Sequence, residues 1–409
     1  MDEKTIVGLD IGTTKIGVVI AEVTEENTVN IVGVGLAQSD GLRKGVVVNI
    51  DKTVQAIEKA VEEAELMAGI DIDSVFVGIA GGHIKSINSK GVVAVTNANS
   101  EITEEDVARV IEQAKAVAIP IDRQIIHVIP QEFIVDEQAG IKEPVGMSGV
   151  RLEVEAHVVT GAITSAANIY KSVEKAGLNV LDIVLEPLAS SYAVLSEDEK
   201  ELGVALIDMG GGTTDIAIFF DNAIRHTAVV GLGGKNVTSD IAIGIRTPIE
   251  RAEEIKKRFG LAMASLARKE EYVEVPGVGG RESREISRSV LASIIEPRLE
   301  EIFSLVKREI KRSEFADMLG AGIVLTGGGA LLEGIVEVAE QVFEMPVRVG
   351  NPTGFGGLAD SVKSPIWATG VGLIHYGNKN FGNLMVEKKE GELFKNIVDK
   401  FRQIFRDYF

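Results

Sequence analysis

Residues 8–16 read Gly-Leu-Asp-Ile-Gly-Thr-Thr-Lys-Ile and lie between two runs of β-branched side chains. The dense apolar pattern on both sides of the Gly-Thr-Thr turn predicts a hairpin of two buried strands over residues 5–23. A second copy spans 203–220, where Gly-Val-Ala-Leu-Ile-Asp-Met-Gly-Gly-Gly-Thr-Thr-Asp leads into another apolar run. Two related units roughly 200 residues apart predict a pseudo-two-fold protein in which each half contributes one hairpin to a shared cleft.

Asp10 and Asp208 each end an apolar strand and precede a glycine-rich turn that carries two threonines. Glycines let backbone N–H groups approach phosphate oxygens closely, and successive amides in such a turn form an anion-binding nest. An Asp at this place can hold Mg²⁺ directly or through water, because magnesium prefers oxygen ligands and keeps part of its hydration shell. Aspartates also shape ordinary turns. The second copy in a matching context favours a metal–phosphate site.

A third glycine cluster, residues 327–329, follows a strand-like run and precedes a segment with a helical pattern. One glycine would satisfy a tight turn between a strand and a helix. Three indicate a surface where a flat ligand can lie against bare backbone.

Composition excludes several classes of protein. The chain has 409 residues, 45% of them apolar, with 42 Lys plus Arg against 61 Asp plus Glu and a formal net charge of -19. This length and apolar content predict a folded protein with several domains. The acidic balance argues against a general nucleic-acid binder. The chain has no cysteine, which excludes disulfide scaffolds and thiolate metal sites, and its five histidines lack metal-ligand spacing. No secretory signal pattern opens the chain, and no apolar stretch reaches the length of about 18 to 20 residues that spans a bilayer, so we expect a cytoplasmic body.

Two stretches interrupt the repeated halves. Over 83–160 the pattern changes to short strands around one helix, with Thr103 as the expected N-cap, which predicts an inserted α+β subdomain. Over 232–288 the chain is more polar and contains a strand-like ribbon around 272–280, which predicts a second insertion.

The C-terminal segment differs from the rest of the chain. Residues 377–392 have the composition of a flexible tether. Residues 393–409 place apolar and aromatic side chains on one helical face and four cations on its flank, which is typical of an interfacial membrane helix. The alternative is a helix that docks on the body of the protein or on a partner. The predicted membrane-facing residues are Leu393, Phe394, Ile397, Phe401, Ile404, Phe405 and Phe409.

The order of these features resembles a known superfamily. Two Asp-Gly-Thr hairpins, Glu-Pro-Leu-Ala-Ser at 186–190 and a late Gly-Gly-Gly-Ala are similar to the phosphate loops, first connecting helix and adenosine loop of the actin/DnaK-chaperone/sugar-kinase ATPase superfamily. Residues 8–16, residues 233–242 and the amphipathic C-terminus resemble, more narrowly, the FtsA family of bacterial cell-division proteins. The resemblance implies an α/β, actin-like two-domain ATPase fold with a cleft between pseudo-two-fold halves, an inserted α+β subdomain and a C-terminal amphipathic helix.

The resemblance also implies a division into subdomains. The expected boundaries are 1–82 plus 161–198 for subdomain IA, 83–160 for the inserted subdomain IC, 199–231 plus 299–376 for subdomain IIA, 232–298 for subdomain IIB, 377–392 for a flexible linker and 393–409 for the membrane-targeting helix.

Site residues are carried over from the resemblance by matching position. Asp10 and Asp208 would hold the magnesium end of ATP. Glu186 would orient a water near the γ-phosphate in a catalytic role, and Asp215 would assist in positioning it. The other expected nucleotide contacts are Gly12, Thr13, Thr14, Lys15, Gly210, Gly211, Gly212, Thr213, Thr214, Gly233, Gly234, Lys235, Glu253, Lys256, Gly327, Gly328 and Gly329.

The function implied is that of an ATP- and Mg²⁺-binding protein with at most slow ATPase activity. It would self-associate into filaments and bind other division proteins. It would also tether the FtsZ ring to the cytoplasmic side of the cell membrane at the division site, as a peripheral protein. The FtsZ C-terminal peptide is expected at subdomain IIB, and the IC insertion is expected to be a surface for self-association or partners. The alternatives are a pilus-assembly-type actin-like ATPase, a small-molecule kinase and a chaperone-like ATPase.

Overall fold

Half I is built on a six-stranded sheet, and the first predicted hairpin lies at its centre. The computed structural model of the protein describes residues 4–96, 99–268, 270–277 and 282–389. The strand order in the sheet is β11 (Asn179–Leu185), β6 (Ser74–Ile79), β1 (Lys4–Ile11), β2 (Lys15–Val23), β3 (Val29–Gln38) and β19 (Gly356–Gly357). β1 and β2 pair antiparallel from Lys4↔Val23 to Ile11↔Ile16, which confirms the predicted hairpin.

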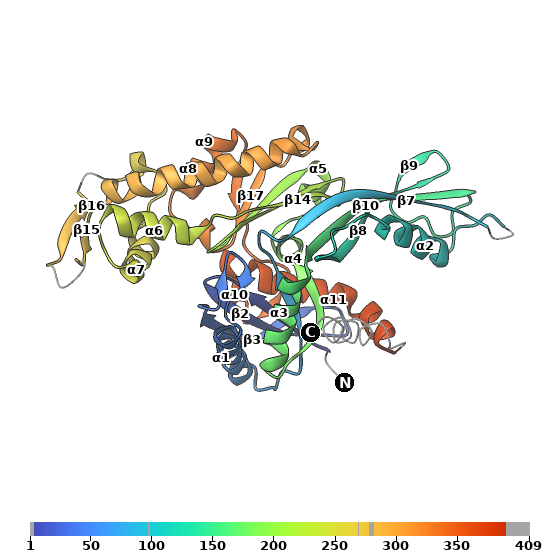
Figure 1. Cartoon of the computed structure of the whole chain (residues 1–409), viewed down its shortest axis with the longest axis horizontal. Helices are drawn as coiled ribbons and strands as arrows, with labels where there is room; N and C mark the ends of the chain where they lie inside the picture. Colours follow the sequence, from blue (N-terminus) through green and yellow to red (C-terminus); the bar gives the residue numbers. More distant parts are fainter. Residues whose placement is uncertain (1–3, 97–98, 269, 278–281, 390–409) are drawn as a thin grey trace.

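Helices cover both faces of this sheet (Figure 1). Helices α1 (Ile50–Ala68) and α3 (Ile163–Lys175) lie against one face, and α4 (Glu186–Val194) and α11 (Ala368–Lys389) lie on the other side. Glycines permit close approach on both faces: a Cβ on Gly35 would lie 1.8 Å from the Ala60 carbonyl oxygen of α1. A Cβ on Gly8 would lie 2.7 Å from the Gly370 carbonyl oxygen of α11.

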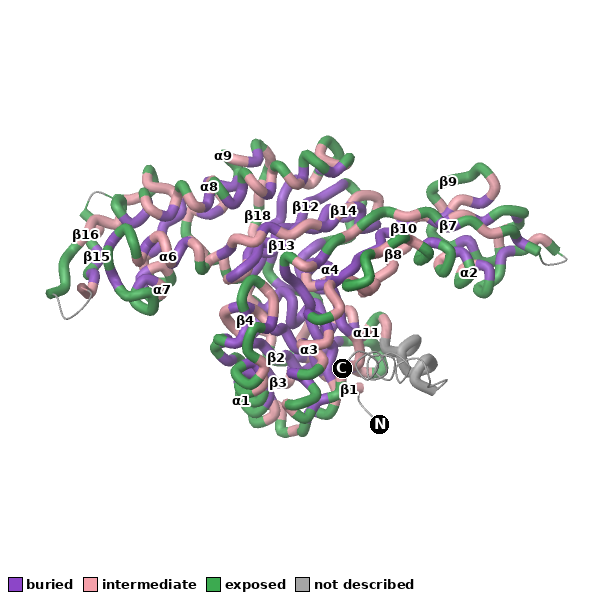
Figure 2. The backbone as a smooth tube through the Cα atoms, in the orientation of Figure 1, coloured by how far each residue is buried: buried purple, intermediate pink, exposed green. Residues whose placement is uncertain are grey.

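Half II repeats the same topology. Its five-stranded sheet has the order β14 (Ala223–Val230), β13 (Thr214–Phe220), β12 (Val204–Met209), β17 (Ile323–Thr326) and β18 (Val347–Val349). As in half I, three antiparallel strands are followed by two strands that join in parallel. The helices of half II are α5 (Glu197–Leu202), α8 (Arg288–Arg312) and α9 (Ile335–Phe343). The matching strand orders confirm the predicted internal repeat, and the buried residues concentrate in the two sheets (Figure 2).

The first insertion, subdomain IC, is the α+β unit that the sequence predicts. Its sheet has the order β7 (Lys85–Ala94), β10 (Arg151–Ala162), β8 (Arg123–Val135) and β9 (Gln138–Ile141), and helix α2 (Glu104–Lys115) packs on it. Thr103 caps α2, since its hydroxyl accepts from the Asp106 N–H while the Asp106 carboxylate accepts from the Thr103 N–H.

Subdomain IC also reaches half II, where its side chains bond to the edge strand β14. Gln131 donates to the Ile224 carbonyl oxygen at 2.7 Å, and Asn88 donates to that of Arg225 at 3.3 Å. His157 lies 2.7 Å from Asn88 Oδ1 and 3.0 Å from the Thr227 hydroxyl, and burial lowers its pKa to about 3. IC therefore bridges the two halves, and His157 is a buried structural residue.

The second insertion, subdomain IIB, lies at the opposite end of the molecule from IC (Figure 1). It contains α6 (Gly234–Gly244), α7 (Ile249–Phe259), η1 (Ala264–Leu266), β15 (Tyr272–Val275) and β16 (Arg284–Ser287). The antiparallel pair β15–β16 is the expected ribbon. The remaining short elements of the chain are β4 (Leu42–Arg43), β5 (Val46–Val47), η3 (Ala316–Met318), η4 (Gly328–Leu331), α10 (Ala359–Val362) and η5 (Pro365–Trp367).

Two predicted boundaries near the C-terminus need correction. The expected extent of IIA to residue 376 is wrong, because β19 pairs with β3 and α11 packs on β1, β2 and β6, so the chain rejoins half I at about residue 356. The expected flexible linker 377–392 is helical through Lys389. Its Gly377, which suggested flexibility, is a packing glycine, since a Cβ there would lie 2.7 Å from Phe76 Cε2. The predicted membrane helix 393–409 lies outside the described residues, and within the described ranges no helix is long and apolar enough to cross a bilayer.

Candidate nucleotide cleft

The two glycine-rich turns meet across the boundary between the halves. A Cβ on Gly211 would lie 2.3 Å from Thr14 Cγ2, and a Cβ on Gly212 would lie 2.7 Å from Thr13 Oγ1, so a side chain at either glycine would collide with the opposite turn. Lys235 of IIB donates to the Thr13 carbonyl oxygen at 3.0 Å. The fold thus brings both predicted phosphate turns to one place.

Four carboxyl groups gather around these turns. Asp10 ends β1 and forms an ion pair with Lys15, and Asp208 and Asp215 are register partners on β12 and β13. Glu186 opens α4, and its pKa is raised well above the usual range, first by desolvation and then by the charges of Asp10, Asp215 and Asp208. Burial likewise raises the pKa of Asp208 to about 6 and that of Asp215 to about 7. Raised carboxyl pKa values on converging groups mark a site that favours positive charge.

A divalent cation fits this arrangement. Asp215 Oδ1 is buried without a hydrogen-bond partner, and the carboxylates around it repel one another. Among the described residues, no group of three or more His, Asp or Glu side chains is arranged to hold a metal ion by itself. Magnesium that takes part of its ligands from phosphate and water would suit such a site, because few protein ligands are then required.

The predicted nucleoside residues form a connected group beside the second turn. The Gly234 N–H donates to the Gly210 carbonyl oxygen at 3.0 Å, and a Cβ on Gly233 would lie 2.6 Å from the same oxygen. Lys256 of α7 donates to the Gly234 carbonyl oxygen at 3.1 Å and to Glu253 at 2.7 Å. Burial opposes ionisation of Glu253, but Lys256 outweighs it and the pKa of Glu253 is lowered. Lys256 and Glu253 therefore form an ion pair, and the bond from Lys256 to the Gly234 carbonyl oxygen fixes this pair to the start of α6.

The third glycine cluster closes the same region from β17. Gly327 has a φ of 80°, and a Cβ there would lie 2.3 Å from Asp208 Oδ1. A Cβ on Gly329 would lie 2.5 Å from Met209 Cγ. The cluster therefore lies against the end of β12, beside the second glycine-rich turn.

The structure adds neighbours of the cleft that are not among the predicted site residues. Trp367, the single tryptophan of the chain, is buried, and Lys15 Nζ lies 5.8 Å from its ring centroid. Ser190 and Thr369 both hydrogen-bond to Asp208. The Gly45 N–H donates to the Thr13 hydroxyl at 2.9 Å. No local sequence signal marks Trp367, Thr369 or Gly45, because the fold brings them to the cleft from distant segments.

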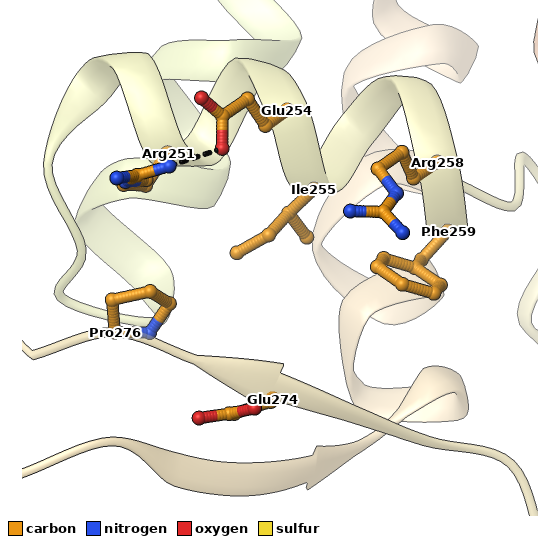
Figure 3. Close-up of a pocket in the computed structure, with 7 residues that line it drawn as sticks. All are labelled: Arg251, Glu254, Ile255, Arg258, Phe259, Glu274 and Pro276. Atoms are coloured by element: carbon orange, nitrogen blue, oxygen red, sulfur yellow. Dashed lines mark hydrogen bonds and ion pairs between the residues drawn. The ribbon is translucent and has the colours of Figure 1, made fainter.

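A separate pocket lies in subdomain IIB, between α7 and β15 (Figure 3). Its apolar residues and charged groups occur side by side, with Arg251 paired to Glu254 at 2.7 Å and the Arg258 guanidinium 5.3 Å from the Phe259 ring centroid. The lining residues are Arg251, Glu254, Ile255, Arg258, Phe259, Glu274 and Pro276.

Two sheets of the same topology, with an Asp-Gly-Thr turn from each at a common cleft, define the actin-like ATPase class, whose fold implies nucleotide binding. Solved structures agree with this class. The "PilM-PilN type IV pilus biogenesis complex" superposes with a TM-score of 0.67 at 16% identity over 92% of this chain and 99% of that one. MreB5 of Spiroplasma citri bound to ADP superposes with a TM-score of 0.56 at 15% identity over 93% and 99%.

Sequence comparisons identify the family. The profile described as "Cell division protein FtsA" matches residues 205–372, "SHS2 domain inserted in FTSA" matches 81–160, and "Hsp70 protein" matches 164–223. The chain is 54% identical to the cell division protein FtsA of Pseudomonas aeruginosa over 91% of its length and 89% of that protein. It is 50% identical to that of Neisseria meningitidis over 94% of both chains, and 45% identical to that of Escherichia coli K12 over 95% and 94%. The chain belongs to the FtsA family of cell division proteins.

Proposed function

We propose that this chain is an ATP-binding, self-assembling adaptor that tethers the FtsZ division ring to the cytoplasmic face of the cell membrane. The observation that carries the proposal is the meeting of both Asp-Gly-Thr turns and Glu186 in one cleft, in a member of a cell-division family. The predicted C-terminal amphipathic helix would supply the attachment to lipid, and the remainder of the protein would supply assembly and partner binding.

The turns are suited to phosphate because they supply backbone N–H groups, hydroxyls and Lys15 at one place. Since Thr13 and Thr14 contact Gly212 and Gly211 directly, the turns would separate slightly to admit phosphate oxygens. Asp10 and Asp208 would hold Mg²⁺, which neutralises phosphate charge when bound. Lys15 is paired with Asp10 and would shift toward phosphate when the metal takes its place beside that carboxylate.

Glu186 and Asp215 would act on water. Both carboxyls lie beside the phosphate turns on the ends of rigid elements, α4 and β13. Burial and the neighbouring carboxylates raise the pKa of both groups, so each keeps its proton to a higher pH than a free carboxyl group would, and a bound cation would lower both pKa values. This arrangement agrees with slow turnover at most, in which ATP serves mainly to set the conformation.

The IIB pocket is the proposed site for the FtsZ C-terminal peptide. Arg251 and Arg258 would pair with acidic side chains of the peptide, Arg251 by exchanging its present partner Glu254, while Ile255, Phe259 and Pro276 form an apolar surface beside them. A short peptide that carries both acidic and apolar residues matches this combination, because charge steers and positions the ligand while apolar contact supplies affinity.

Subdomain IC is the proposed surface for self-association or further division proteins. Exposed apolar side chains occur on it, including Ile87, Val92, Val145 and Val150, of which Val150 is 64% exposed. Side-by-side assembly would also strengthen membrane attachment, since several weakly binding helices act together.

The test of the tether is recruitment of fluorescent FtsZ polymers to anionic phospholipid vesicles by this protein with Mg-ATP. The wild-type chain should bring FtsZ to the vesicles, and the double variant Arg251→Glu/Arg258→Glu should bind vesicles but leave FtsZ in solution. Arg246→Glu is the matched control, because Arg246 is exposed in the same subdomain outside the pocket. Equal recruitment by the double variant would remove the IIB site from the proposal, and no recruitment by the wild type would refute the tether.

A further inference from the structure

Asp208 is held at the base of the cleft by a pair of hydroxyl groups. Ser190 Oγ donates to Asp208 Oδ2 at 2.9 Å, and Thr369 Oγ1 lies 3.5 Å from the same oxygen. The two hydroxyl oxygens are 3.1 Å apart, so the three groups lie in mutual contact, and the two hydroxyl hydrogens can make two of the three hydrogen bonds at a time. Ser190 is fully buried, and Thr369 and Asp208 are less than a tenth exposed.

These hydrogen bonds cross from one half of the protein to the other. Asp208 ends β12 in half II, whereas Ser190 lies on α4 and Thr369 on α11, both in half I. A glycine keeps the two helices close enough for the pair to form, since a Cβ on Gly372 would lie 1.9 Å from the Ala189 carbonyl oxygen. The direction of the Asp208 carboxylate therefore depends on how the halves sit against each other.

The two oxygens of Asp208 have different surroundings. Oδ2 accepts from the hydroxyl pair, whereas Oδ1 faces Gly327, whose positive φ and missing side chain keep that side clear. The hydroxyls thus fix which oxygen is turned toward the glycine cluster. A carboxylate held in one direction by two donors loses little freedom when it takes a further ligand.

We propose that Ser190 and Thr369 are positioning residues that hold Asp208 in the orientation for Mg²⁺, and that they do so only when half I and half II have the relative position seen in this structure. The inference deepens the proposed nucleotide function and rests on it. It predicts that loss of the hydroxyls weakens the contribution of the metal to ATP binding, while the contacts that ATP makes without metal are retained.

The experiment measures ATP affinity of the full chain by titration calorimetry in Mg²⁺ and again in EDTA. The ratio of the two dissociation constants gives the magnesium-dependent gain. Ser190→Ala/Thr369→Val should lower this gain about tenfold, since a hydrogen bond to a charged group contributes on the order of one to two powers of ten in affinity, and should leave the EDTA value unchanged. Ser190→Ala alone should lose more of the gain than Thr369→Val, because its bond is the shorter one.

Two further variants separate positioning from stability. Thr369→Ser keeps the hydroxyl and should restore the gain. Ser191→Ala removes the neighbouring buried hydroxyl of α4, which donates to the Leu188 carbonyl oxygen at 2.7 Å, and should leave the gain as in the wild type.

Three results would overturn the inference. The double variant could keep the full gain, its affinity could fall by the same factor in Mg²⁺ and in EDTA, or Ser191→Ala could lower the gain as much as Ser190→Ala does. If the double variant does not fold, the single variants decide by the same criteria. A wild-type chain with no magnesium-dependent gain would overturn both this inference and the proposed role of Mg²⁺, whereas a normal wild-type gain retained in the variants would overturn this inference alone.

Discussion

Asp215→Asn should stabilise the nucleotide-free protein more at pH 8 than at pH 5. Asp215 is 3% exposed and has one oxygen without a hydrogen-bond partner, and burial together with Asp208 raises its pKa to about 7. The folded protein therefore binds a proton that the unfolded chain has released above pH 4. Stability falls as the pH rises from about 4 to 7, because the folded state loses its preference for the proton over that range.

The magnitude follows from the size of the shift. The pKa rises from an ordinary 3.8 to about 7, and a difference of roughly three pKa units corresponds to about 4 kcal/mol of destabilisation once the group is ionised in both states. At pH 5 the corresponding penalty is about 2 kcal/mol, because the folded state is still protonated. An asparagine carries no charge at either pH. The change in the free energy of unfolding caused by Asp215→Asn should therefore be more stabilising at pH 8 than at pH 5 by roughly 2 to 3 kcal/mol. Any cost of burying the amide is the same at both pH values and cancels in this comparison.

Guanidinium unfolding followed by the fluorescence of Trp367 gives the free energy of unfolding for wild type and variant at both pH values. Asp40→Asn serves as the control, because Asp40 is exposed and its replacement should have the same small effect at both pH values. An Asp215→Asn effect that is equal at the two pH values, or larger at pH 5, would refute the account of this carboxyl as a proton-binding group in the cleft.

Three further outcomes are expected. Addition of Mg-ATP should change the emission of Trp367, since Lys15 Nζ lies 5.8 Å from its ring, and Lys15→Met should remove most of that change in a fluorescence titration. Lys256→Met should lower ATP affinity about tenfold or more by calorimetry, because it removes the closer of the two ammonium groups that pair with the half-buried Glu253 carboxylate and leaves only Lys257, at 3.5 Å; an affinity equal to that of the wild type would argue against a nucleoside site here. Thr103→Ala should lower the stability of subdomain IC by about 1 kcal/mol, detected as faster hydrogen exchange in α2, and unchanged exchange would mean that the cap contributes little.

Local sequence patterns predicted the repeated hairpins and the capped helix of IC, because each depends on residues that are neighbours in the chain. The run of β-branched residues around the turn at 8–16 requires buried strands, and Thr103 followed by Asp106 specifies a helix start. The three glycine clusters lie close together in the structure, and each follows directly on a strand.

Contacts between distant segments could not be predicted in this way. Ser190 and Thr369 are 179 residues apart and come together only because α4 and α11 cross at a glycine. The return of the chain to half I at β19 depends on a two-residue strand with no periodicity of its own. The wrong prediction of a flexible linker has the same cause. Residues 377–392 have the composition of a tether, but the first of them, Gly377, packs against Phe76, which is distant in the sequence.

We propose that this one chain combines a nucleotide cleft with a membrane-binding C-terminus. The most direct test is sedimentation with anionic phospholipid vesicles in Mg-ATP, comparing the full chain with one that ends at Lys389, the last residue of α11. The full chain should pellet with the vesicles, whereas the shortened chain should stay in solution and still bind ATP with the wild-type affinity. Equal pelleting of the two chains would contradict a tether in the C-terminal segment and favour a helix that docks on the protein.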